Sequence, residues 1–178
     1  MKKFLLHTCC APCSVAIIDE LKEKFDLTVF FYNPNIFPED EYLKRKEEVV
    51  KVCKKWDVKM MDYDYVPEDW DEKVKGFESE PEMGARCSVC FKMRLEKTAK
   101  YARDNNFDLF STSLTSGRNK KADIINPIGK SLEEKFGVKY YEEDWKKSGR
   151  QEKGIKLVND MDIYRQDYCG CKYSRLSS

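Results

Sequence analysis

Long apolar segments are missing from this chain of 178 residues. No run of about 18 apolar residues occurs, so the sequence predicts no membrane-spanning helix and no membrane partner. The N-terminus, MKKFLLHTCC, has only three apolar residues between its lysines and the next polar residue, too few for a secretory signal. We therefore expect a cytoplasmic protein.

Internal repeats and linkers rich in Pro, Gly or Ser are also missing, and the net charge is only +1. The low net charge excludes the strongly basic signature of many nucleic-acid-binding proteins. With 41% hydrophobic and 37% charged residues, the composition is typical of a soluble globular chain. The length is that of one domain, so we predict a single domain over residues 1–178.

Charge is distributed unevenly along the chain. Residues 62–82 carry nine acidic side chains against two lysines, whereas residues 145–156 carry five basic side chains against one glutamate. Such runs are most often solvated faces. A second basic cluster at Arg118, Lys120 and Lys121 nevertheless indicates an anionic partner.

Apolar runs of strand length alternate with helical patterns. Strands are expected at 3–7, 27–32, 58–63, 107–113 and 138–143, and a polar loop at 114–121. Helices are expected at 12–25, 39–56, from Glu68, at 86–105, around Pro127 with a break at that proline, and at 151–160. This order predicts a single Rossmann-like α/β domain, a parallel sheet flanked by helices. Ligands bind such sheets at the strands' carboxyl ends, where HTCC and STSLTSGRNKK fall.

Eight cysteines and a single histidine are the unusual part of the composition. In a reducing cytoplasm, so many cysteines indicate metal binding or redox chemistry. Cys53 lies on the apolar stripe of its expected helix and is predicted to be a packing residue. His7 lies on an expected strand, where a core histidine is more common than a ligand.

Two cysteine blocks have metal-ligand spacing. Cys87 and Cys90 are three residues apart at a helix start, so both sulfurs can face one ion. Two thiols from the block Cys9, Cys10 and Cys13 would complete four ligands for a 4Fe-4S cluster, or equally for zinc. CAPC is also similar to the C-x-P-C of thioredoxins, which is the competing interpretation. Cys169 and Cys171 flank Gly170, as in a small strained redox-active disulfide or a pair of metal ligands.

Four segments together, LHTCCAPC, RCSVCFKMRLEKTAKYA, STSLTSGRNK and YRQDYCGCKYS, resemble the QueH family of epoxyqueuosine reductases over essentially the whole chain. The resemblance implies a fold similar to the nucleotide α-hydrolase (HUP-like) group, although its SGGxDS phosphate loop is missing. It implies cobalamin-independent reduction of epoxyqueuosine to queuosine, the final step of queuosine synthesis. The implied substrates are tRNAs for Asp, Asn, His and Tyr, which carry GUN anticodons.

The resemblance also implies site residues and cofactors. Cys9, Cys10, Cys87 and Cys90 would hold a 4Fe-4S cluster, and Cys169 and Cys171 would be the redox-active pair. Cys13 is left as a candidate ligand of a second metal, iron or another ion. The expected proton donors are Asp167, Tyr168 or His7, and the expected phosphate contacts are Arg118, Lys120, Lys121, Lys146, Lys147 and Arg150.

An electron donor that the sequence does not identify completes the expected partners. Two alternatives stay open at this point, a thioredoxin-type thiol–disulfide oxidoreductase and a non-enzymatic zinc-binding RNA module.

Overall fold

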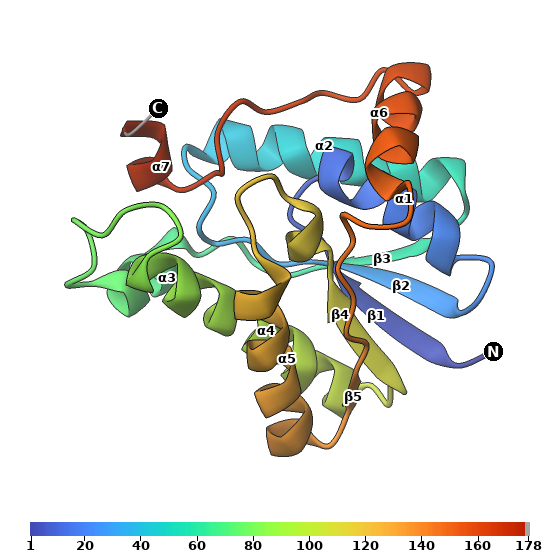
Figure 1. Cartoon of the computed structure of the whole chain (residues 1–178), viewed down its shortest axis with the longest axis horizontal. Coiled ribbons are helices and arrows are strands. Elements are labelled where there is room, and N and C mark those ends of the chain that lie inside the picture. The colour runs from blue at the N-terminus through green and yellow to red at the C-terminus, as the bar shows by residue number, and fades with distance from the viewer. Residues whose placement is uncertain (177–178) are drawn as a thin grey trace.

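Five parallel strands form the centre of the structure, a computed structural model that describes residues 1–176 (Figure 1). The strand order is β3-β2-β1-β4-β5. The strands are β1 (Lys3–His7), β2 (Asp26–Phe31), β3 (Lys59–Asp62), β4 (Leu109–Thr112) and β5 (Lys139–Tyr140). Phe4 of β1 pairs with Leu27 on one side and Leu109 on the other, so β1 is the central strand. The predicted parallel sheet is confirmed.

Helices cover both faces of this sheet, as Figure 1 shows. On one face lie α1 (Ala11–Leu21), α2 (Glu39–Lys55) and α6 (Arg150–Asp160), and on the other α4 (Ala85–Asp104) and α5 (Ala122–Phe136). Beyond the carboxyl ends of the strands lie α3 (Pro67–Val74) and the short α7 (Lys172–Leu176), while a 3-10 turn, η1 (Ser113–Ser116), follows β4. No helix within residues 1–176 is long and apolar enough to cross a membrane.

The sheet separates the core into two apolar layers, one on each face, and the central strand contributes to both. Successive side chains of a strand point to opposite faces, so Phe4 and Leu6 pack in one cluster and Leu5 in the other. All three side chains are fully buried. Because both faces of a parallel sheet are covered by helices, its strands are apolar at nearly every position, which explains the run FLL.

Pro127 does not break its helix, so that expectation is wrong. α5 runs without interruption from Ala122 to Phe136 and contains Pro127. Proline lacks the N–H that would bond the carbonyl of Asp123, but Asp123 lies in the first turn of α5. The helix therefore loses one hydrogen bond near its start and continues for nine residues beyond the proline. The loop expected after β4 begins with η1, and α7 was not expected.

Two glycines inside helices should respond oppositely to substitution by alanine. A Cβ at Gly129 in α5 would lie 2.5 Å from carbons of the Tyr140 ring, whereas at Gly154 in α6 the nearest atom would be 3.9 Å away. We expect Gly129→Ala to cost about 1–3 kcal/mol of unfolding free energy through overpacking. Gly154→Ala should add up to about 1 kcal/mol, because alanine favours a helix. Urea unfolding checks both, and equal midpoints would contradict the packing assigned to Gly129.

Candidate active site

A cavity of about 950 Å³ opens at the carboxyl ends of β1 and β4. The chain leaves β1 toward β2 on one side, and β4 lies on the other, which makes this edge the topological switch point where parallel sheets bind ligands. Four cysteine side chains line the cavity, Cys9, Cys10, Cys13 and Cys169. The predicted positions of HTCC and STSLTSGRNKK at this edge are confirmed.

Three of these thiols form a compact group, Cys9, Cys10 and Cys13, whose sulfur atoms all lie within 4.8 Å of one another. The local backbone explains the group, because Cys10 is extended at the N-cap of α1 and Pro12 lies in the first turn of that helix. Cys10 and Cys13 are then three residues apart on one face, and the Sγ atoms of Cys9 and Cys10 are 3.8 Å apart. Three thiols so close are a potential metal site.

The three thiols of this group differ in how readily they ionise, because the pKa of Cys9 is lowered and those of Cys10 and Cys13 are raised. Hydrogen bonds from the Cys10 and Cys13 thiols hold the pKa of Cys9 well below its usual range, and Lys120 and Arg94 act in the same direction. Hydrogen bonds with Cys13 and Cys9 and burial raise the pKa of Cys10. Burial lowers the pKa of the Lys120 ammonium, but negative charge on Cys169, Cys9 and Cys13 outweighs burial and raises it.

Cys87 lies in the first turn of α4 and Cys90 in the second. Cys87 packs in the same apolar cluster as Cys9 and Cys10, and its sulfur accepts the backbone N–H of Met83 at 3.2 Å. Cys90 packs instead in a separate apolar cluster that also contains Trp70, Val74 and Cys171. Burial raises the pKa of both Cys87 and Cys90, and the neighbouring thiols of Cys169 and Cys171 add to it.

The two predicted redox residues, Cys169 and Cys171, are free thiols in this structure, so the expected disulfide is not formed here. Gly170 between them has φ +138°, a conformation that side-chain-bearing residues rarely adopt. Its carbonyl accepts the N–H of Phe37 at 2.8 Å. The Arg45 guanidinium of α2 donates to the carbonyl of Cys169 at 2.8 Å. The pair therefore lies on a backbone segment held from the side of α2.

Cys53 and His7 are core residues. Cys53 packs in the apolar layer beneath α1 and α2, and burial raises its pKa to about 12. The His7 Nε2 donates to the carbonyl of Tyr32 at 3.1 Å, and Nδ1 lies 2.9 Å from the Thr112 hydroxyl, which donates to it. Burial and the nearby Arg94 lower the pKa of His7 to about 4. The imidazole is therefore neutral at pH 7, with both nitrogens engaged.

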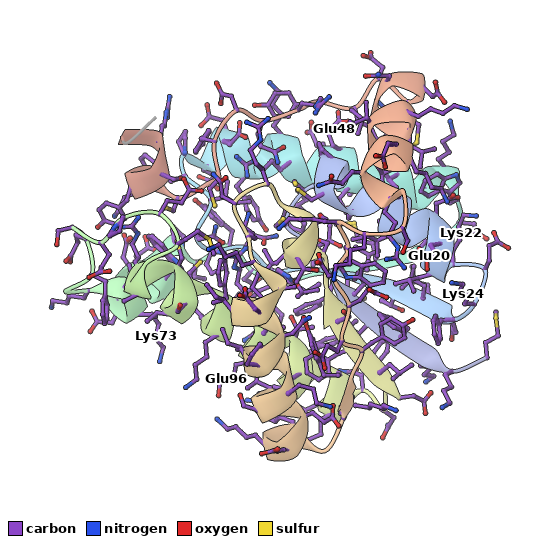
Figure 2. All side chains as sticks on the ribbon, in the orientation of Figure 1. Glu20, Lys22, Lys24, Glu48, Lys73 and Glu96 are labelled. Carbon is purple, nitrogen blue, oxygen red and sulfur yellow. The ribbon has the colours of Figure 1, made fainter. Side chains whose placement is uncertain are left out.

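The basic residues predicted to contact phosphate divide into two groups. Arg118, Lys120, Lys146 and Arg150 line the cavity, and among the described residues Lys121 and Lys147 do not. Arg150 is already paired within the fold, 2.7 Å from Glu20 of α1, a residue labelled in Figure 2. Its guanidinium also stacks on Trp145. Lys146 also has a partner within the fold, since its ammonium donates to the carbonyl of Lys120, but it forms no ion pair with a carboxylate among the described residues. Arg118 and Lys146 therefore keep more of their charge available for an anion than Arg150 does.

The sequence analysis missed three residues that shape the site: Arg45, Arg165 and Gln166. Arg165 and Gln166 line the cavity, and the Gln166 amide contacts Cys10. Both lie in YRQDYCGCKYS, where only the cysteines, Asp167 and Tyr168 received a role, so a signal for them existed. Arg45 had no signal, because it lies in a helix with charges at most positions and contacts the site 124 residues away.

Comparison with known proteins agrees with this geometry. Residues 4–177 match the family model described as epoxyqueuosine reductase QueH. The epoxyqueuosine reductase QueH of Histophilus somni is 43% identical over 174 residues, covering 97% of this chain and 72% of that protein. The same-named protein of Thermotoga maritima is 38% identical over 179 residues, covering 99% of this chain and 92% of that protein.

Solved structures share the fold at low sequence identity. The U34-tRNA thiolase NcsA from Methanococcus maripaludis, described with its [4Fe-4S] cluster, has a TM-score of 0.58 at 16% identity, covering 97% of this chain and 61% of that one. A protein described as a predicted subunit of a tRNA methyltransferase from Methanocaldococcus jannaschii has a TM-score of 0.57 at 15% identity, covering 88% and 76%. The predicted Rossmann-like fold, a parallel sheet flanked by helices, is confirmed. On the strength of the family match, the chain belongs to the QueH family of epoxyqueuosine reductases, which are oxidoreductases.

Proposed function

We propose that this chain reduces epoxyqueuosine to queuosine in tRNA, the final step of queuosine synthesis, without cobalamin. One observation supports this most directly in a chain of this family: four thiols and several cations line a single cavity at the ligand-binding edge of the sheet. The proposed substrates are the tRNAs for Asp, Asn, His and Tyr, with GUN anticodons. The family match favours this function over the thioredoxin-type and zinc-module alternatives.

A 4Fe-4S cluster on Cys9, Cys10, Cys87 and Cys90 is the proposed cofactor. These four thiols match the type and number of ligands that a cubane needs. Cys87 packs in the same cluster as Cys9 and Cys10, whereas Cys90 packs in the cluster that holds Cys171. Lys120 and Arg94 would offset the negative charge that these thiolates bring. When bound, the cluster supplies electrons one at a time. Cys13 lies within 4.8 Å of two of the ligands and remains the candidate for a second metal ion.

The chemistry requires a two-electron reductant. Converting an epoxide to an alkene and water consumes two electrons and two protons. Closing a disulfide between Cys169 and Cys171 releases two electrons and two protons, so one dithiol balances one turnover. An external donor must then reduce the disulfide again. Because glycine separates the two cysteines and tolerates φ +138°, the backbone there has the freedom that a small ring needs.

The cavity residues would orient the substrate and handle the leaving oxygen. The Lys120 ammonium, close to Cys9, Cys13 and Cys169, is placed to stabilise negative charge that develops on the epoxide oxygen. Asp167 and Tyr168 also line the cavity and remain candidates for moving a proton. His7 is set aside as a donor, because it is neutral and both of its nitrogens are engaged.

Cluster binding can be tested through two serine substitutions and a matched cysteine control. Protein purified without oxygen should be brown and hold about four iron and four sulfide ions per chain. Cys87→Ser and Cys90→Ser should each lower the iron content, because each removes one thiolate. Cys53→Ser should keep the iron, since Cys53 lies in the other apolar layer. Colourless wild-type protein that holds one zinc ion would contradict the proposed cluster.

The reaction itself can be tested without oxygen on tRNA that carries epoxyqueuosine. Wild-type protein supplied with a chemical reductant should form queuosine, and no product would contradict the proposed function. Cys169→Ser and Cys171→Ser should bind wild-type amounts of iron yet lose nearly all turnover, because one thiol cannot deliver two electrons. The measurement is queuosine formed beside iron per chain. Loss of iron in either variant would make these residues metal ligands instead.

Binding of tRNA should depend on the cations that line the cavity. Arg118→Ala, Lys146→Ala and Arg165→Ala should weaken binding, and each phosphate interaction that a substitution removes should reduce the salt slope of affinity by about 0.7–0.9. Lys100→Ala, at an exposed lysine of α4 outside the cavity lining, should leave the slope unchanged. Titrations at several salt concentrations give the slope. An identical slope in all variants would place the phosphate-binding residues on another face.

A further inference from the structure

Gln166 joins the segment that carries Cys169 and Cys171 to the thiol group at the start of α1. Its amide Nε2 donates a hydrogen bond to the sulfur of Cys10 at 2.9 Å, across 156 residues of sequence. Gln166 precedes Cys169 by only three residues, and both side chains line the cavity. One short segment thus supplies a thiol of the proposed redox pair and an amide that touches a proposed cluster ligand.

The nitrogen of the Gln166 amide has a hydrogen-bond partner, whereas the oxygen has none among the described residues. The nitrogen points at a sulfur, whereas Oε1 is buried. A side chain placed for packing or for its own hydrogen bonding would satisfy the oxygen, since an unpaired buried acceptor costs stability. A thiolate that binds a metal has no proton to donate, so only a donor can face it favourably. The orientation therefore matches a metal-bound Cys10.

The segment that presents the amide is firmly held. The Arg45 guanidinium is almost fully buried and donates to the carbonyls of Cys169 at 2.8 Å and Tyr168 at 3.1 Å. Glu41, one turn earlier on α2, accepts from Arg45 Nε at 2.6 Å and from the Tyr164 hydroxyl at 3.1 Å. Because Tyr164 and Tyr168 lie on either side of Gln166, the backbone that positions the amide is fixed on both sides.

We propose that Gln166 is a positioning residue that donates to the Cys10 sulfur when Cys10 holds the cluster, and so raises the cluster's reduction potential. Hydrogen bonds to ligating sulfurs withdraw electron density and favour the reduced state, and partners of the ligands tune metal centres in this way. The inference rests on the proposed function, because it needs the cluster. Its consequence is that the segment with the two-electron pair also sets how readily the one-electron centre is reduced.

Two substitutions of Gln166 and one matched glutamine control test the inference. Gln166→Ala removes the donor, and Gln166→Glu keeps the shape but replaces the donor with a carboxylate. Gln151 lines the same cavity from α6, and no hydrogen bond from it to a thiol occurs among the described residues. The measurements are iron and sulfide per chain, and the midpoint potential of the cluster from a redox titration followed by electron paramagnetic resonance.

We expect all three variants to hold wild-type amounts of iron. The midpoint potential should become more negative in Gln166→Ala, and more negative still in Gln166→Glu, whereas Gln151→Ala should match the wild type. An unchanged potential in both Gln166 variants with a full cluster would overturn the inference. Loss of iron in both would also overturn it, since Gln166 would then hold the site together. A wild-type protein without a cluster would instead refute the proposed function, a result distinct from the other two.

Discussion

The parallel pairing of β1 with both β2 and β4 is the constraint on which the rest of the structure depends. His7, the last residue of β1, lies opposite Phe30 on one side and Thr112 on the other. Parallel strands end at the same edge, so the chain must leave β1 and β4 side by side there. The thiol group follows β1, and η1 follows β4. α1 and η1 contact each other at this edge, and both contribute residues to the cavity lining. The Ser116 hydroxyl, for example, donates to the carbonyl of Cys13 at 2.6 Å.

Buried cations are the second feature that links the fold to the site. Arg94 is buried on α4, where burial lowers the pKa of its guanidinium, but negative charge on nearby Cys90 and Cys9 outweighs burial and raises it. Burying a cation is costly unless an opposite charge offsets it. Among neutral thiols, Arg94 and Lys120 would lack that offset, whereas thiolates would supply it. The two cations therefore favour a thiolate at Cys9, whose pKa lies well below its usual range, whereas burial raises the pKa of Cys87 and Cys90.

Features that depend on a local sequence pattern could be predicted, whereas contacts between residues far apart in the sequence could not. The apolar run at 3–7, the helical spacing at 39–56 and the C-x-x-C at the start of α4 are short-range signals, and the sheet, its helices and the position of the cysteine blocks followed from them. Pro127 misled because a proline near a helix start removes one bond rather than ending the helix. The contact between Arg45 and Cys169 spans 124 residues, and no local pattern indicates such a partner. The short distances between the sulfur of Cys13 and those of Cys9 and Cys10 likewise depend on the extended backbone at Cys10, which a sequence pattern does not specify.

The two proposed electron carriers lie on parts of the structure that are held in different ways. Cys9 and Cys10 are buried where β1 meets α1, so their sulfurs are held by the sheet itself. Cys169 and Cys171 lie instead on a segment outside the sheet that is bound to α2 through its carbonyls. A disulfide between them must bring two sulfurs within bonding distance, which changes the backbone around Gly170. Arg45 and Phe37 hold this backbone through the Cys169 and Gly170 carbonyls, and the Cys171 sulfur accepts the N–H of Ser174 at 3.3 Å. Closing the disulfide would therefore require these contacts to adjust, whereas Cys9 and Cys10 lie outside that segment.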